Sequence, residues 1–204
     1  MNEEEAKQIL KNDLNFSENN INNLEIFRIM LIEYNAKYNL ISKSTENSIW
    51  SRHILDSAQL LKYFNVSSEG VLADLGSGAG FPGLVLAIFI KNPQFHVKLI
   101  EKSPIKREFL NNVVTKLKID VEILDNVYEA KINPDIIVAR AFKKLDQIIN
   151  ISREKMKKPH KIIILKGKNA QFEINNVSLP SNYSYKLENS ITSVDSKIII
   201  VEAR

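Results

Sequence analysis

Residues 71–83 read VLADLGSGAGFPG, in which an aspartate and four glycines follow a short apolar run. Glycines allow the backbone to approach a ligand closely, and a helix that begins after such a loop presents unpaired N–H groups to it. A strand followed by a glycine-rich loop is therefore typical of a site for a nucleotide-like ligand. We expect Asp74, Gly76, Gly78 and Gly80 to contact that ligand.

The spacing within the loop separates two ligand classes. A dinucleotide fingerprint reads G-x-G-x-x-G, whereas this chain reads G-x-G-x-G and has Phe81 where the third glycine would lie. Phe81 would crowd a pyrophosphate but can pack beside an adenosine or a sulfonium side chain. Asp74 would repel phosphates and suits the positively charged end of an amino-acid-like ligand.

A second acid strengthens this interpretation. Glu101 closes the next predicted strand, about twenty residues after the loop, where a carboxylate can accept hydrogen bonds from both hydroxyls of a ribose. The loop and Glu101 together favour S-adenosylmethionine over NAD as the cofactor. The competing interpretation is that Asp74 only caps the turn and that Glu101 is a surface charge.

Missing residue types narrow the choice of methyl acceptor. The chain has no cysteine, which excludes covalent catalysis of pyrimidine C5 methylation and thiolate zinc sites. Residues 139–142 read ARAF and not the Asn/Asp-Pro-Pro-aromatic run of many enzymes that methylate exocyclic amines. A guanine N7 has an in-plane lone pair and no proton, so its methylation needs alignment rather than a general base. The sequence is therefore compatible with methylation of a guanine N7.

Three polar residues admit both a functional and a structural interpretation. Arg140 ends a buried-looking strand, where an unpaired guanidinium is costly. In the functional interpretation, Arg140 contacts the cofactor or a phosphate near the target base. In the structural interpretation, it forms a salt bridge, for instance to Asp74 or Glu101. His53 and Asp56 lie three residues apart on one predicted helical face and can touch, and such a pair is more often structural than catalytic. The three histidines form no ligand motif, so we expect no metal site.

Positive charge is concentrated in the part of the chain that carries the loop. Residues 1–70 have a net charge of −3 and residues 71–204 one of +7. This asymmetry is typical of a polyanion partner such as nucleic acid, although a lysine-rich solvated surface gives the same count. Basic residues follow three predicted strands, where they could hold phosphates around the pocket. They are Lys102, Arg107, Lys143, Lys144, Lys166 and Lys168.

Helices and strands must position these residues. Helical periodicity dominates residues 1–70, with Ser17 as a predicted N-cap, and strands alternate with helices thereafter. The predicted strands are 71–75, 95–101, 121–124, 135–139, 161–166, 183–187 and 197–202, with helices from Pro82, from Pro104 and over 145–151. The alternation predicts a doubly wound α/β fold with parallel strands buried on both faces. The last two strands predict an antiparallel pair.

Five blocks in order resemble a known family. They are 39–61, 71–88, 99–113, 135–142 (DIIVARAF) and 164–168 (ILKGK), and they are similar to the bacterial RsmG/GidB family. The resemblance implies a class I, Rossmann-like S-adenosylmethionine-dependent methyltransferase fold, with a mostly parallel seven-stranded sheet, an antiparallel C-terminal strand and an N-terminal helical part. It also implies methylation of a guanine N7 in 16S ribosomal RNA, presented in the small ribosomal subunit.

The resemblance also implies roles for individual residues. Gly76 and Phe81 lie at the cofactor, the 126–129 segment frames the adenine through Val127 and Tyr128, and Arg140 lies at the edge of the cofactor site. Tyr128 departs from the family, in which an acidic residue is common at that position.

The domain boundary and the rival functions complete the prediction. We expect a helical extension over 1–70 and a methyltransferase domain over 71–204, in a monomeric cytoplasmic protein without a signal peptide or a membrane span. The main hypothesis is ribosomal RNA guanine-N7 methylation. The alternatives are a methyltransferase acting on another RNA, a protein or a small molecule, an NAD-dependent oxidoreductase, and a non-catalytic RNA-binding protein.

Overall fold

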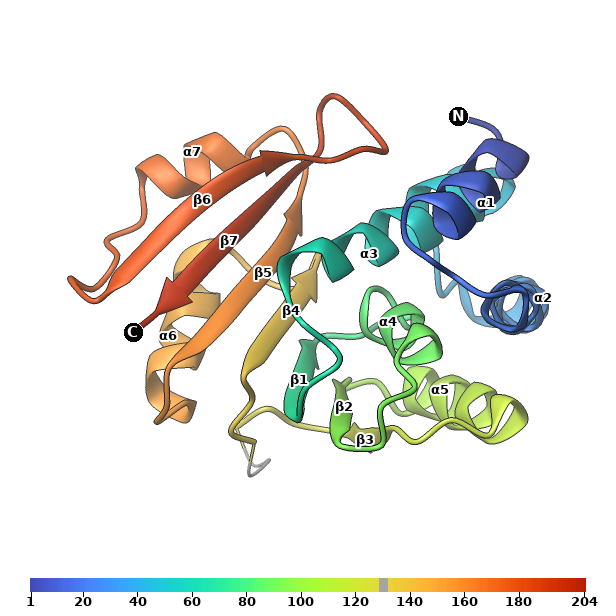
Figure 1. Cartoon of the computed structure of the whole chain (residues 1–204), viewed down its shortest axis with the longest axis horizontal. Coiled ribbons are helices and arrows are strands. Elements are labelled where there is room, and N and C mark those ends of the chain that lie inside the picture. Colours follow the sequence, from blue (N-terminus) through green and yellow to red (C-terminus); the bar gives the residue numbers. More distant parts are fainter. Residues whose placement is uncertain (129–131) are drawn as a thin grey trace.

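The computed structural model describes residues 1–128 and 132–204 and has a seven-stranded sheet at its centre (Figure 1). The strand order is β3-β2-β1-β4-β5-β7-β6. The strands are β1 (Gly70–Leu75), β2 (Phe95–Ile100), β3 (Glu122–Leu124), β4 (Ile136–Arg140), β5 (His160–Lys166), β6 (Tyr183–Asn189) and β7 (Lys197–Ala203). Strands β1 to β5 pair in parallel, and β7 runs antiparallel to both β5 and β6. The predicted mostly parallel sheet is confirmed.

Helical segments precede and connect the strands. They are α1 (Glu3–Asn12), α2 (Glu18–Tyr38), η1 (Lys43–Ser48), η2 (Trp50–Leu55), α3 (Asp56–Ala58), η3 (Gln59–Tyr63), α4 (Gly83–Phe89), α5 (Pro104–Leu117), α6 (Leu145–Lys155) and α7 (Ala170–Asn175). The Ser17 hydroxyl accepts a hydrogen bond from the Asn20 N–H, which confirms the predicted N-cap. None of the helices described is both long enough and apolar enough to cross a bilayer.

The segment between α2 and β1 is less regular than predicted. The helical periodicity of residues 1–70 predicts regular helices, but residues 43–63 form 3₁₀, π, α and 3₁₀ turns in succession. Single π-helical turns are uncommon and often occur at functional sites. The π-helical turn η2 carries His53, which lies beside the cavity described below.

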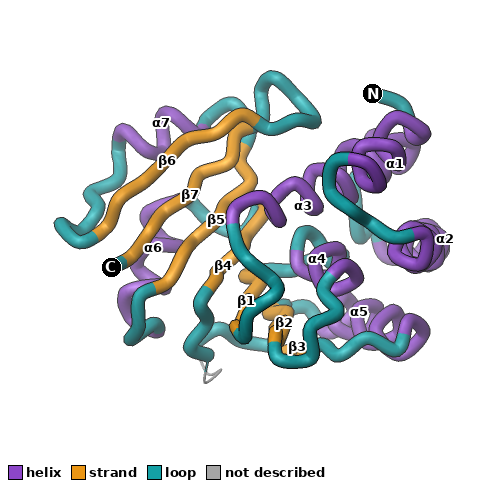
Figure 2. Tube along the Cα trace, in the orientation of Figure 1, coloured by secondary structure: helices purple, strands orange, loops and turns teal. Residues whose placement is uncertain are grey.

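Each face of the sheet has its own hydrophobic core. Successive strand residues point to opposite faces, so Leu72 packs into the first core and Ala73 into the second. The first core includes side chains of α2, α4 and α5, and the second includes those of α6 and α7. Figure 2 shows these two groups of helices on opposite sides of the strands.

The N-terminal helices pack into the first core. The Phe27 ring of α2 lies 5.3 Å from the Phe81 ring and 6.2 Å from the Phe109 ring. The Asn20 side chain donates a hydrogen bond to the Ile88 carbonyl at 2.6 Å. These contacts fix α2 against α4 and α5 and bring the segment after α2 to the edge of the sheet where the site lies.

Candidate functional site

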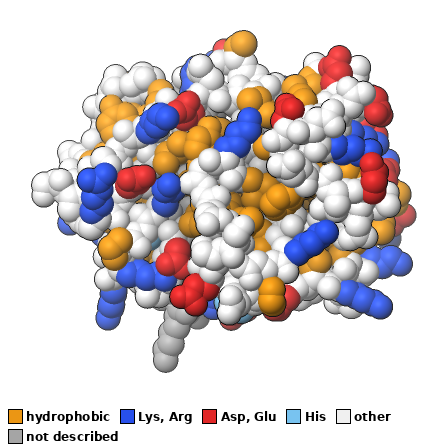
Figure 3. Space-filling view, viewed as in Figure 1, with side chains coloured by type: hydrophobic (Ala, Val, Ile, Leu, Met, Phe, Trp, Pro, Cys, Tyr) orange, Lys and Arg blue, Asp and Glu red, His pale blue; other side chains and the backbone are white. Residues whose placement is uncertain are grey.

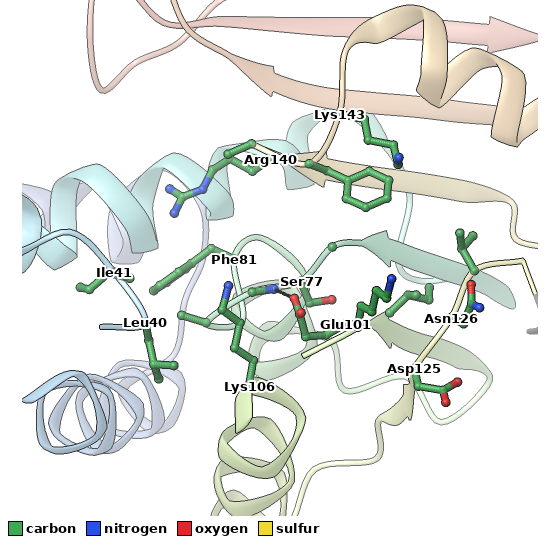
Figure 4. A pocket seen from close by; sticks show the side chains of 18 of the residues that line it. Leu40, Ile41, Ser77, Phe81, Glu101, Lys106, Asp125, Asn126, Arg140 and Lys143 are labelled. Atoms are coloured by element: carbon green, nitrogen blue, oxygen red, sulfur yellow. Dashed lines mark hydrogen bonds between the residues drawn. The ribbon is translucent and has the colours of Figure 1, made fainter. Parts of the chain in front are cut away.

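A cavity of about 510 Å³ lies where β1, β2, β3 and β4 end (Figure 4). Ligands of open α/β sheets bind at this edge, and the volume lies within the range of roughly 300–1000 Å³ typical of small-molecule sites. Leu40 and Ile41 lie at one end of the cavity and Asp125 and Asn126 at the other. The glycine loop and Glu101 lie between them.

The glycine loop forms one wall of the cavity. Gly76 has φ +74°, and a Cβ on it would lie 2.3 Å from a carbon of the Phe142 ring. Only glycine combines this backbone conformation with so close a neighbour. The Gly76 and Ser77 N–H groups donate to the Ile100 carbonyl at 2.8 and 3.0 Å. The loop is therefore fixed to the end of β2 by its own backbone.

Asp74 lies beneath the loop and not on the cavity wall. Its side chain is fully buried, its Oδ2 accepts the Gly83 N–H at 2.9 Å, and a Cβ on Gly83 would lie 2.6 Å from that oxygen. Burial raises the pKa of Asp74 to about 7. The structure therefore gives Asp74 contacts with the start of α4 rather than the direct ligand contact that we expected. Gly80 also faces away from the cavity, toward Leu84.

Glu101 connects the loop to the helix that follows β2. Its Oε2 accepts the Gly78 N–H and its Oε1 accepts the Ser103 N–H, both at 2.8 Å. The residue is only 8% exposed, so the interpretation of Glu101 as a surface charge is wrong. Each carboxylate oxygen has two lone pairs, which leaves both oxygens able to accept a ligand hydroxyl.

The segment after β3 forms the far end of the cavity. Val127 is buried and Tyr128 is half exposed, and both line the cavity. The Lys155 ammonium donates to the Tyr128 carbonyl and lies 5.7 Å from the centre of its ring. Glu129, the last residue of the 126–129 segment, lies outside the residues that the structure describes.

Asp125 lines the cavity and was missed by the sequence analysis. Its signal was present, because Asp125 directly follows the predicted strand 121–124 just as Glu101 closes the strand before it. The apolar residues Leu40 and Ile41 had no comparable signal, since they reach the cavity only through the packing of α2.

Arg140 lies at the opposite end of the cavity, close to Phe81 (Figure 4). Its guanidinium carbon lies 5.1 Å from the centre of the Phe81 ring. Nη1 donates to the Arg52 carbonyl at 3.1 Å and lies 3.8 Å from Asp56 Oδ2. The salt bridge considered for Arg140 therefore exists, but its partner is Asp56 and not Asp74 or Glu101.

His53 orients Arg140 and is held in one tautomer. Its Nδ1 lies 2.6 Å from Arg140 Nη2 and its Nε2 lies 2.9 Å from Thr45 Oγ1. Because a guanidinium only donates, Nδ1 accepts and Nε2 carries the proton. Burial, with the charges of Arg140 and Arg52, lowers the pKa of His53 to about 3. His53 is a neutral positioning residue, and its ring stacks on Phe81 at 4.9 Å between ring centroids.

The predicted basic residues do not all face the cavity. Lys102 and Lys143 line it, whereas Lys144 and Lys168 are exposed outside its lining. Figure 3 shows one face of the molecule, on which Lys and Arg side chains are interspersed with acidic ones rather than gathered in a single patch.

Arg107 and Lys166 have partners within the protein. Arg107 Nη1 donates to the carbonyls of Glu101 and Lys102, at 2.9 and 2.7 Å. Lys166 forms a salt bridge with Glu173 at 2.8 Å and donates to the Lys143 carbonyl. These two side chains stabilise the ends of β2 and β5, and a phosphate would have to compete with those contacts.

Comparison with known proteins assigns the chain to a family. Residues 20–199 match the family model described as GidB, rRNA small subunit methyltransferase G. The chain belongs to this family. Two relatives of this chain both carry the name "Ribosomal RNA small subunit methyltransferase G". The protein of Orientia tsutsugamushi (strain Ikeda) is 38% identical over 190 residues, covering 92% of this chain and 93% of the relative. That of Pelagibacter ubique (strain HTCC1062) is 34% identical over 200 residues, covering 95% and 93%.

Solved structures agree with this fold. A ribosomal protein L11 methylase from Lactobacillus delbrueckii subsp. bulgaricus superposes with a TM-score of 0.61 at 12% identity, covering 75% of this chain and 79% of its own. A mutant of MtNAS in complex with S-adenosylmethionine has a TM-score of 0.61 at 14% identity, covering 100% and 84%. The class I methyltransferase fold predicted for this GidB chain is confirmed.

Proposed function

We propose that this GidB chain transfers a methyl group from S-adenosylmethionine to a guanine N7 of 16S ribosomal RNA. Family membership over residues 20–199 supports the substrate class. The observation that carries the cofactor assignment is the cavity that joins the glycine loop to Glu101 at the carboxyl ends of β1 and β2.

The lining of the cavity fits S-adenosylmethionine. The backbone at Gly76 and Gly78 allows close approach of a ligand, and the free lone pairs of Glu101 can accept the ribose hydroxyls. Val127 and Tyr128 offer an apolar and an aromatic surface to the adenine. When bound, S-adenosylmethionine supplies an electrophilic methyl group on a positively charged sulfur.

The side chains at the Phe81 end of the cavity support an acceptor that carries no proton. His53 is neutral, and both of its ring nitrogens are hydrogen-bonded, so the histidine is not available as a base. Asp74 is fully buried beneath the loop. A guanine N7 needs only to be aligned with the methyl group, and alignment alone can lower a barrier by about 7–11 kcal/mol in well-oriented systems. Arg140 is the side chain best placed to align it.

The small ribosomal subunit is the proposed partner. Lys102 and Lys143 line the cavity, where they can contact phosphates next to the target base. We infer that residues 71–204 form the methyltransferase domain of a monomeric cytoplasmic enzyme, and that the helices of residues 1–70 cover one side of its site. RNA binding is then expected to weaken as the salt concentration rises.

Labelled methyl transfer tests this function. Small ribosomal subunits from cells that lack the protein should accept methyl groups from S-adenosylmethionine, and subunits already modified by it should not. Mapping of the modified base should identify a 7-methylguanine in 16S ribosomal RNA. Transfer to a protein or a small molecule, with none to either class of subunit, would contradict the proposal.

A further inference from the structure

A second cavity lies on the other side of Arg140. It has a volume of about 330 Å³, and Arg140 and Ala141 line both it and the cofactor cavity. The volume is at the small end of the range for ligand sites, which begins near 300 Å³. Its polar lining comes from η1, η2, the start of α3, the ends of β4 and β5, and the loop between β6 and β7. The main contributors are Thr45, Arg52, His53, Asp56, Lys166 and Thr192.

Asp56 is the acid of this second cavity, and it is firmly held. Its Oδ1 accepts hydrogen bonds from Thr192 Oγ1 at 2.7 Å, Gln59 Nε2 at 2.9 Å and Ser190 Oγ at 3.1 Å. The Asp56 side chain is 12% exposed. Three donors on one oxygen fix the carboxylate and leave Oδ2 with the longer, 3.8 Å contact to Arg140 Nη1. The pair therefore places a fixed acceptor beside a fixed donor.

We propose that this cavity binds the target guanine, with Asp56 Oδ2 accepting its N1–H and N2–H groups and Arg140 donating to its O6. This inference rests on the proposed function. Arg140 has five N–H donors, of which two are engaged by His53 and the Arg52 carbonyl. Along its Watson–Crick edge, guanine presents one acceptor, O6, followed by two donors, N1–H and N2–H. The remaining Arg140 donors can face O6, and the Asp56 oxygen can face the two N–H groups. Adenine has a donor at position 6, an acceptor at position 1 and no polar group at position 2, so the pair would reject it.

The same placement accounts for the atom that is methylated. In guanine, O6 and N7 lie next to one another on the major-groove edge. A base whose O6 contacts Arg140 therefore has its N7 beside the residue that lines both cavities. Enzymes that act on a base commonly extrude it and read its Watson–Crick edge in a pocket. The Thr192 loop and η2 would enclose such a base from two sides.

Nucleotide binding tests the base site separately from catalysis. Guanosine 5′-monophosphate and adenosine 5′-monophosphate are each titrated into the protein. Saturating S-adenosylhomocysteine is present throughout, because it occupies the cofactor cavity and prevents either nucleotide from binding there. Saturation-transfer NMR measures the weak affinities. The wild-type protein should prefer the guanine nucleotide by about tenfold, and inosine 5′-monophosphate, which lacks the N2 amine, should bind with intermediate affinity.

Two variants test the role of the Asp56 carboxylate, and a third variant is the control. Asp56→Asn keeps an oxygen for Thr192 but turns a donor toward the base, so the preference should fall to within twofold. Thr192→Val removes one donor to Oδ1 and should reduce the preference by a smaller factor. Asp195→Asn removes the same charge from an exposed position in the same loop, outside the cavity lining, and should retain the preference. Unchanged S-adenosylhomocysteine affinity shows that each variant is folded.

The outcomes separate the two proposals. Equal binding of the two nucleotides by the wild type, or a tenfold preference retained by a folded Asp56→Asn variant, would overturn the base site. If Asp56→Asn does not fold, a full preference in Thr192→Val overturns it. A wild-type protein that prefers the guanine nucleotide but methylates no ribosomal RNA supports the base site and overturns the proposed function.

Discussion

Two parts of the cofactor cavity, the wall formed by the glycine loop and the end at Arg140, are built in different ways. At the glycine loop, the geometry comes from backbone groups and two carboxylates, Asp74 and Glu101, that lie close together in the sequence. At Arg140, it comes from side chains on three segments that lie far apart in the sequence and meet through contacts such as Arg140–His53 and Asp56–Thr192. The glycine-loop wall depends on glycine conformation, and the Arg140 end depends on long-range packing.

This difference predicts how each part of the cavity fails. A substitution in the glycine loop acts through steric overlap and should remove the cofactor site as a unit. A substitution at the Arg140 end removes one member of a side-chain network and should impair alignment of the acceptor while the cofactor still binds. The following variants test that separation, in order of decreasing effect.

Gly76→Asp should abolish cofactor binding. A Cβ at this position would overlap the Phe142 ring at 2.3 Å, in a backbone conformation that L side chains rarely adopt. We expect a loss of S-adenosylhomocysteine affinity of more than about 100-fold, or roughly 3 kcal/mol, by calorimetry, with RNA affinity largely retained. Gly167→Ala is the control for cofactor affinity, since Gly167 lies outside the lining of the cofactor cavity and a Cβ there meets nothing within 4 Å. Cofactor affinity retained by Gly76→Asp would mean that the loop is not the donor site.

Arg140→Lys should impair methyl transfer more than cofactor binding. Lysine keeps the charge but cannot contact His53, the Arg52 carbonyl and the acceptor base at once. We expect kcat/KM for small subunits to fall about 100-fold, or roughly 3 kcal/mol, and S-adenosylhomocysteine affinity to fall less than about tenfold. Arg153→Lys, on the exposed side of α6, controls for the change of cation. Equal losses in both measurements would place Arg140 in the cofactor site alone.

Glu101→Gln should weaken the cofactor and leave the Arg140 end intact. The amide group would replace one oxygen that accepts the Gly78 or Ser103 N–H, so a donor would face a donor. We expect about a thirtyfold loss of S-adenosylhomocysteine affinity, or roughly 2 kcal/mol. Glu122→Gln, at the exposed first residue of β3, is the control. If Glu101→Gln binds as tightly as the wild type, the ribose contact assigned to Glu101 is wrong.

The pH dependence of stability tests the network around His53. The pKa of His53 is about 3 in the folded protein and about 6.5 when unfolded, so the unfolded state binds more protons between these values. The stability that neutral His53 contributes is therefore complete above pH 6.5 and is lost as the pH falls toward 3.

Denaturation of a His53→Gln variant measures this contribution. Between pH 7 and 5.5, the free energy of unfolding of the wild type should fall by about 1 kcal/mol relative to the variant. His96→Gln, on the exposed side of β2, serves as the control. Parallel curves for the wild type and His53→Gln would show that the histidine is not buried beside Arg140.

The glycine loop and the Arg140 end also differ in how much of each could be predicted from the sequence. The strand order along the chain, the glycine loop and Glu101 were accessible, because each depends on residues that are near one another in sequence. The contact of Arg140 with His53 and Asp56 was not, since these residues are 87 and 84 positions apart from Arg140 and meet only when η2 packs over the end of β4. Asp74 was misplaced for a related reason: its position identifies the strand end but not whether the carboxylate faces the ligand or the start of α4.

The most direct test asks whether the cofactor cavity, which contains Gly76 and Glu101, binds a methyl donor. The purified wild-type protein is titrated by calorimetry with S-adenosylhomocysteine and, separately, with NAD. One S-adenosylhomocysteine should bind per chain, and NAD should give no saturable heat. Saturable binding of NAD together with none of S-adenosylhomocysteine would contradict the cofactor assignment.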